Sequence, residues 1–179
     1  TPEPVSYTFD VTVSNLTAGQ PLSPIAVIAH TEGTLWQIGS PASVALETMA
    51  EGGDNSQLLA LENAIANASS EGPIGPGANT TITLTTDSLE ALKLSLATMM
   101  VNTNDGFTGL SALDVSSLAM GDSLIRTTVA YDAGTEANTE AADTIPGPAD
   151  GGEGFNEARD DVNFVARHPG VVTNEDGLS

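Results

Sequence analysis

The sequence predicts a mainly β protein, an antiparallel β-sandwich with one or two short helices packed on it. Apolar and polar residues alternate with period two over residues 7–13 and 81–85, which is typical of half-buried strands. The 18 glycines and 10 prolines suit short strands joined by many turns. Helical spacing of apolar residues is confined to one interval, residues 41–69.

Strands are expected on both sides of that interval. Residues 5–16 alternate, with Tyr7, Phe9 and Val11 on one side, and the apolar run 24–30 predicts a more buried strand. Further strands are expected at 35–38, 80–86, 92–101, 112–115 and 124–131, with a last short one formed by 164–165 and 171–172.

Residues 41–69 predict two short helices. The first has Pro41 near its start and the Gly52-Gly53 pair at its end. The second has Leu58, Leu61 and Ile65 at helical spacing. Residues 70–79 form a loop by composition.

The chain is expected to fold as a single domain over residues 1–179. Hydrophobic residues make up 40% of the chain, which is enough for one core. Residues of about 139–162 are acidic and rich in glycine and proline, and they predict a long loop without enough apolar residues to order it.

The charge balance excludes several partners. The chain has 24 Asp and Glu against 4 Lys and Arg, a net charge of −20, which disfavours nucleic acids and anionic membrane surfaces. No apolar run approaches the ~20 residues of a membrane span. The absence of cysteine excludes disulfides, zinc–thiolate sites and cysteine nucleophiles.

Two acidic turns make a candidate calcium site. Asp105 follows an apolar strand, and Asp132 and Glu136 follow a later strand, four residues apart around a glycine. Calcium takes six to eight oxygen ligands, several of them carboxylates on loops. If the two strand ends are neighbours, the three carboxylates converge. The alternative reading is two polar turns in an acidic protein.

Four segments in order resemble the spondin N-terminal domain, the family of F-spondin and mindin and of bacterial exported proteins. They are LSPIAVIAHTEGTLWQIGSPAS (22–43), ALETMAEGGD (45–54), ATMMVNTNDGFTGLSALDV (97–115) and YDAGTEAN (131–138). The resemblance implies an eight-stranded antiparallel β-sandwich with Ca²⁺ at one edge, held by acids at the positions of Asp105, Asp132 and Glu136. The family has aspartate where Glu136 stands.

The resemblance also implies a secreted, periplasmic or cell-surface module that serves adhesion, matrix or surface assembly and is not an enzyme. The first residues, Thr-Pro-Glu-Pro, look like the end left by signal-peptide cleavage. The partner is expected to be a protein, a glycan or a second copy of the chain.

A second function, in another class, is copper binding by His30 and His168, with Met99 and Met100 as further soft ligands. The simpler reading is that His30 caps a strand and the methionines fill the core. A hydrolase is the third candidate, but no catalytic motif is present and no catalytic residue is assigned.

Overall fold

The computed structural model describes residues 5–139 and 141–170, and the prediction of a mainly β fold is confirmed. The described residues form eight strands in two antiparallel sheets and two short helices. The strands are β1 (Tyr7–Ser14), β2 (Ala26–His30), β3 (Ala66–Ser69), β4 (Asn79–Thr86), β5 (Lys93–Met99), β6 (Gly106–Asp114), β7 (Ala130–Asp132) and β8 (Ala166–Arg167), and the helices are α1 (Val44–Gly52) and α2 (Ser56–Leu59).

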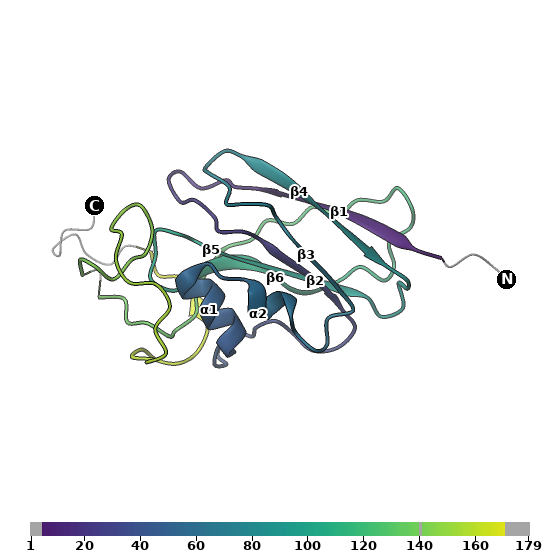
Figure 1. Ribbon diagram of the computed structural model, residues 1–179. Helices are drawn as coiled ribbons and strands as arrows, with labels where there is room; N and C mark the ends of the chain where they lie inside the picture. Colours follow the sequence, from purple (N-terminus) through teal and green to yellow (C-terminus); the bar gives the residue numbers. More distant parts are fainter. Residues whose placement is uncertain (1–4, 140, 171–179) are drawn as a thin grey trace.

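The elements stack in three layers around a central six-stranded sheet (Figure 1). Its strand order is β3-β2-β5-β6-β7-β8. The two-stranded sheet β1-β4 covers one face, and α1 and α2 cover the other. Two hydrophobic cores result, one between the sheets and one beneath the helices.

Strand β2 contributes to both cores, which explains its continuous apolar run. Val27 and Ala29 face the β1-β4 sheet, whereas Ala26 and Ile28 face the helices. All five residues of β2 are buried. The expectation of a strand more buried than β1 is therefore confirmed, because a central strand covered on both faces needs apolar side chains at every position.

Helix α1 has defined caps at both ends. The Ser43 hydroxyl accepts a hydrogen bond from the Leu46 amide at 3.2 Å, satisfying one of the unpaired donors of the first turn. Gly53 ends the helix in the left-handed conformation, with φ of 70°, and its amide bonds to the Met49 carbonyl. Leu46 and Met49 pack against the sheet with no exposed surface.

Two sequence-based predictions in the first half of the chain are wrong. Residues 35–38 form no strand, because the amides of Leu35 and Trp36 bond to the Ser111 hydroxyl instead of to a neighbouring strand. The second helix ends at Leu59, and Ala66–Ser69 becomes β3. Pairing with the edge of β2 outweighs helical spacing there.

In the second half, strand positions shift. β6 begins at Gly106, not at residue 112, and β7 covers only the last part of the predicted strand 124–131. Residues 124–129 are rich in β-branched side chains but lie outside any strand. β8 begins directly after the predicted segment 164–165, and the predicted segment 171–172 lies outside the described residues.

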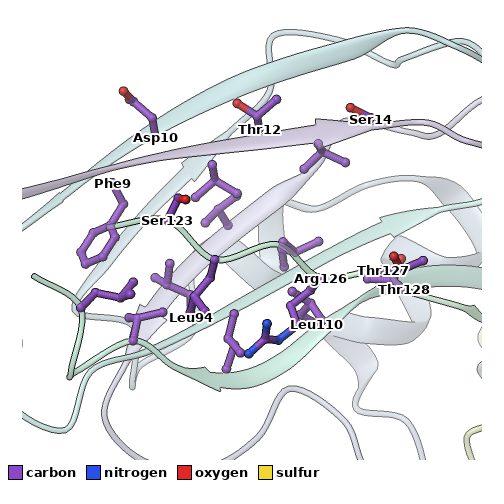
Figure 2. Close-up of a pocket in the computed structure, with 18 of the residues that line it drawn as sticks. Phe9, Asp10, Thr12, Ser14, Leu94, Leu110, Ser123, Arg126, Thr127 and Thr128 are labelled. Carbon is purple, nitrogen blue, oxygen red and sulfur yellow. The ribbon is translucent and has the colours of Figure 1, made fainter. Parts of the chain in front are cut away.

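A groove runs between β1 and the extended segment 121–129 (Figure 2). Its volume is about 1100 Å³. The floor consists of the inner faces of β5 and β6, including Leu94, Leu96 and Leu110. The groove arises because a two-stranded sheet faces a six-stranded one, so part of the larger sheet has no layer above it.

The acidic loop of about 139–162 folds back onto the domain at the opposite end. The Glu153 amide donates to the Asp143 carbonyl at 2.9 Å, and the Asp160 amide donates to the Thr135 carbonyl at 3.1 Å. Arg159 reaches α1. The loop is thus held largely by hydrogen bonds to backbone and side-chain groups and by one ion pair.

Candidate metal centre

Three acidic residues reach this end of the molecule from different elements. Glu51 lies in the last turn of α1, Asp105 in the turn between β5 and β6, and Glu136 in the loop after β7. The pairing of β6 with β7 places Asp132 opposite the first residue of β6, and the Ala133 amide donates to the Asp105 carbonyl at 3.2 Å. The two acidic turns identified in the sequence are therefore neighbours.

Asp105 is a fully buried carboxylate with only one oxygen bonded. Its Oδ2 accepts from the amides of Thr135 at 2.9 Å and Glu136 at 3.2 Å. Its Oδ1 is buried and has no hydrogen-bond partner among the described residues. Burial, followed by repulsion from Asp132, raises the pKa of Asp105 to about 7.

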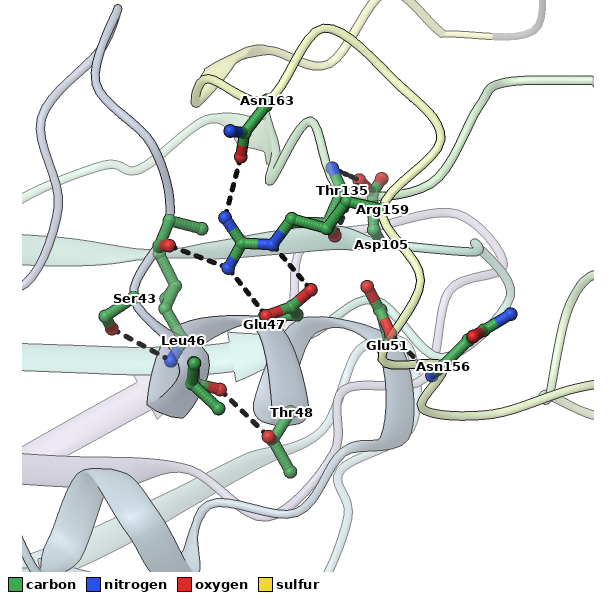
Figure 3. A network of polar contacts seen from close by, with 12 residues as sticks. Ser43, Leu46, Glu47, Thr48, Glu51, Asp105, Thr135, Asn156, Arg159 and Asn163 are labelled. Atoms are coloured by element: carbon green, nitrogen blue, oxygen red, sulfur yellow. Dashed lines mark hydrogen bonds and ion pairs between the residues drawn. The ribbon is translucent and has the colours of Figure 1, made fainter.

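Glu51 shows the same half-satisfied state. It has no exposed surface, and its Oε2 accepts from the Asn156 amide at 2.9 Å (Figure 3). Its Oε1 is buried without a partner in the described part of the chain. Burial raises the pKa of this carboxyl above its ordinary value.

Glu136 supplies the third such oxygen. Its Oε2 is buried and finds no partner within residues 5–139 and 141–170. Burial, and then repulsion from Glu51 and Asp105, raises the pKa of Glu136 to about 8. Glu51 raises the pKa of both Asp105 and Glu136, and Asp105 raises that of Glu136, so the three carboxyls are electrostatic neighbours as well as buried ones.

Asp132, the remaining predicted ligand, lies beside this group, but both of its carboxylate oxygens already accept hydrogen bonds. Its Oδ1 accepts from the Gly134 amide at 2.8 Å, and its Oδ2 accepts from the Asn138 side chain at 2.6 Å. Gly134 has φ of 69°, and a Cβ there would clash with the Phe164 carbonyl, so only glycine fits this turn. Asp132 shapes the loop that carries Glu136 and adds negative charge next to Asp105.

These carboxylates are not a preformed ligand set. Among the described residues, no group of three or more His, Cys, Asp or Glu side chains is arranged so that it could hold a metal ion as it stands. The unbonded oxygens are nevertheless of the hard type that calcium prefers. Burying a carboxylate oxygen without a partner is costly, and it is unusual for three to occur together. Rotation of the side chains would have to bring them into one coordination shell.

Glu51 was not identified as a candidate ligand from the sequence, although its position in the helix is informative. Glu47 and Glu51 stand four residues apart on one helix, so they share a face. Glu51 occupies the last turn, where the helix dipole disfavours negative charge. A buried acid that breaks this rule indicates a role beyond helix stability.

The structure does not bring His30 and His168 together. His30 ends β2 and His168 follows β8, with β5, β6 and β7 between them. Four strand spacings correspond to roughly 19 Å. Both ring nitrogens of His30 are within 2.8 Å of protein oxygens, those of Glu32 and Ser95. Met99 is buried in the core beneath the helices, so the simpler reading accounts for these residues.

Three aromatic rings pack beneath the acidic turns. Trp36 contacts Phe107 edge to face, with ring centroids 5.1 Å apart, and Tyr131 lies 5.5 Å from both. Phe107 is two residues after Asp105, and Tyr131 directly precedes Asp132. Since Trp36 is the only tryptophan, its fluorescence reports on this end of the molecule.

Comparison with known proteins finds no protein-family model and no curated protein that matches this chain. The resemblance to spondin N-terminal domains therefore remains a prediction from sequence motifs. Neither helix of the described residues has the length and apolar character needed to cross a membrane.

Proposed function

We propose that this protein is a calcium-binding β-sandwich module, of the spondin N-terminal type, in which Asp105, Asp132, Glu136 and Glu51 hold one Ca²⁺. The observation that carries the proposal is the trio of buried carboxylate oxygens without partners, contributed by Glu51, Asp105 and Glu136. Calcium supplies what such oxygens lack, because it coordinates several carboxylates at once.

The role of the ion is structural. It would join the end of α1 to the turn before β6 and to the loop after β7, which are otherwise connected mainly through hydrogen bonds. A binder specific for the folded state stabilises it by about 2.7 kcal/mol at a hundredfold excess over Kd. We place the module outside the cytoplasm, where calcium sites of roughly 10⁻⁴–10⁻³ M affinity are saturated.

Adhesion, matrix or surface assembly is the biological role proposed for such a module. Its support is the sequence resemblance together with the net charge of −20, which favours cationic partners and disfavours nucleic acids. The partner is a protein, a glycan or a second copy of the chain.

The test is a calcium titration of metal-free protein, followed by calorimetry and by thermal unfolding. We expect calcium to raise the melting temperature of the wild type. Asp105→Asn and Asp132→Asn should each remove most of that response, because each takes away a negative charge at the centre. Asp10→Asn is the matched control, since Asp10 is exposed on β1 and bonds only to Thr83.

Two results would contradict the proposal. A wild type that neither binds calcium nor changes its melting temperature would leave the buried oxygens without this explanation. If instead Asp105→Asn and Asp132→Asn responded to calcium as the wild type does, the ion would bind elsewhere.

A further inference from the structure

Residues 153–163, here named the strap, cross from the acidic loop over α1 and back to the loop after β7. The strap bonds to that loop through the Asn163 amide, which donates to the Gly134 carbonyl at 2.8 Å. In the other direction, the Ala137 amide donates to Asp160 Oδ1 at 2.7 Å. Together with the bond from the Asp160 amide to the Thr135 carbonyl, three hydrogen bonds join the strap to the segment that carries Glu136.

The side chain of Arg159 joins the strap to α1. Arg159 forms a two-pronged pair with Glu47, with Nε to Oε1 at 2.7 Å and Nη2 to Oε2 at 2.6 Å (Figure 3). Nη2 also donates to the Ala42 carbonyl at 2.9 Å, and Nη1 donates to Asn163 Oδ1 at 2.7 Å. Glu47 is 3% exposed, so the pair is shielded on the helix side, and its fork geometry fixes direction as well as distance.

The strap also forms a hydrogen bond to Glu51, one of the carboxylates of the metal centre. The Asn156 amide donates to Glu51 Oε2, and this bond leaves Glu51 Oε1 as the oxygen without a partner. Glu47 and Glu51 lie one helical turn apart on α1, so Arg159 and Asn156 bond to the same face of the helix. The orientation of Glu51 thus depends on where Arg159 anchors the strap.

We propose that Arg159 is a positioning residue for the calcium site, which it orders through the strap and Glu51, and that calcium binding and strap docking are coupled. The inference rests on the proposed function. Coupling is reciprocal: the factor by which a docked strap strengthens calcium binding is the factor by which calcium strengthens docking.

A role in positioning and a role of charge alone predict different results. Arg159 carries a positive charge near the centre, and that charge repels a cation. Replacing Arg159 by lysine keeps this charge, and replacing Glu47 and Arg159 together by glutamine removes one negative and one positive charge. If charge alone mattered, neither change would weaken calcium binding. If Arg159 positions the strap, both replacements weaken binding, because neither glutamine nor lysine reproduces the arginine fork.

The experiment is calcium calorimetry on the full chain in its wild-type, Arg159→Lys and Glu47→Gln/Arg159→Gln forms. The double variant leaves no unpaired charge in the protein interior, which protects its folding. Arg126→Gln is the control for loss of an arginine outside the strap, because Arg126 lies by the groove and its side chain bonds only to the Ile125 carbonyl among the described residues. We expect the Kd for calcium to be roughly tenfold higher in both strap variants, as for other residues that orient metal ligands. In Arg126→Gln we expect an unchanged Kd.

A second readout follows the strap in the wild type. Amide hydrogen exchange at Asn156 should slow when calcium is added, and Arg159→Lys should reduce that slowing. Calcium binding of wild-type strength in both strap variants, or tighter binding, would overturn the positioning role while leaving the calcium site standing. An amide exchange rate at Asn156 that does not change when calcium is added would also overturn the positioning role. A wild type without any calcium binding would remove both proposals.

Discussion

The two ends of this sandwich differ in the kind of side chain that they enclose. At the carboxylate end, polar groups from α1, the β5–β6 turn, the β7 loop and the strap bond to one another across 23 to 112 residues of sequence. At the groove end, leucines of β5 and β6 face a cavity of about 1100 Å³, bordered by an exposed extended segment. One end has buried carboxylate oxygens without hydrogen-bond partners among the described residues, and the other has apolar surface without a covering layer.

The difference teaches where each kind of side chain contributes to stability. Phe107 beneath the carboxylate end is fully enclosed, whereas Leu110 at the groove is half-buried. An apolar substitution should therefore cost more beneath the acids, and specific effects of charge and pH should be largest there. The following measurements test that contrast from the largest expected effect to the smallest.

Phe107→Ala should destabilise the protein by about 3–5 kcal/mol, because the ring has no exposed surface and packs against Trp36 and Tyr131. Leu110→Ala, three residues further along β6 and half-buried at the groove, should cost only about 1 kcal/mol. Urea unfolding of both variants measures the contrast. Equal losses would mean that the groove is filled in solution.

The metal-free protein should lose stability as the pH rises from about 4 to 8. The folded state raises the pKa of Asp105 to about 7 and of Glu136 to about 8, whereas the unfolded chain releases both protons near pH 4. The folded state therefore binds more protons in this interval, and the stabilisation present below pH 4 is lost by pH 8. For Asp105, the rise in pKa from 3.8 to about 7 corresponds to a loss of about 4 kcal/mol.

Urea unfolding at pH 5 and pH 8 in the presence of a chelator measures this loss. The general repulsion of a chain with net charge −20 acts in the same direction. The double variant Asp105→Asn/Glu136→Gln separates the two causes, since it should show a clearly flatter profile. A profile as steep as that of the wild type would assign the effect to overall charge alone.

Ser43→Ala should cost about 1 kcal/mol, because it removes the side-chain cap that holds the first turn of α1. Ser123→Ala, at an exposed position bordering the groove, is the matched substitution and should be nearly silent. Thermal unfolding of the two variants compares them. A cap without effect would mean that packing alone fixes the helix that carries Glu51.

Ile125→Ser should change stability by less than about 0.5 kcal/mol, since Ile125 is 87% exposed in the segment beside the groove. Chemical unfolding at two protein concentrations is the appropriate measurement. A loss above about 1 kcal/mol would show that this segment packs against something in solution, and a concentration dependence would identify a second copy of the chain.

Local pattern was sufficient for several elements. Alternation predicted β1 and β4, a continuous apolar run predicted the doubly buried β2, and the proline and glycine signals bounded α1. These features follow from period and capping, which act over a few residues. The same reasoning singled out Asp105, Asp132 and Glu136 as acids at strand ends.

Only the tertiary structure decided the rest. Residues 66–69 became β3 because the edge of β2 was available, and residues 124–129 joined no strand in spite of their β-branched side chains. Glu51 became a partner of Asp105 and Glu136 because α1 packs on the sheet beside the β6–β7 ends, and Asp132 was drawn into its own loop. Burial and strand pairing depend on residues far apart in the chain, so no local pattern could reveal which oxygens would be enclosed without a partner.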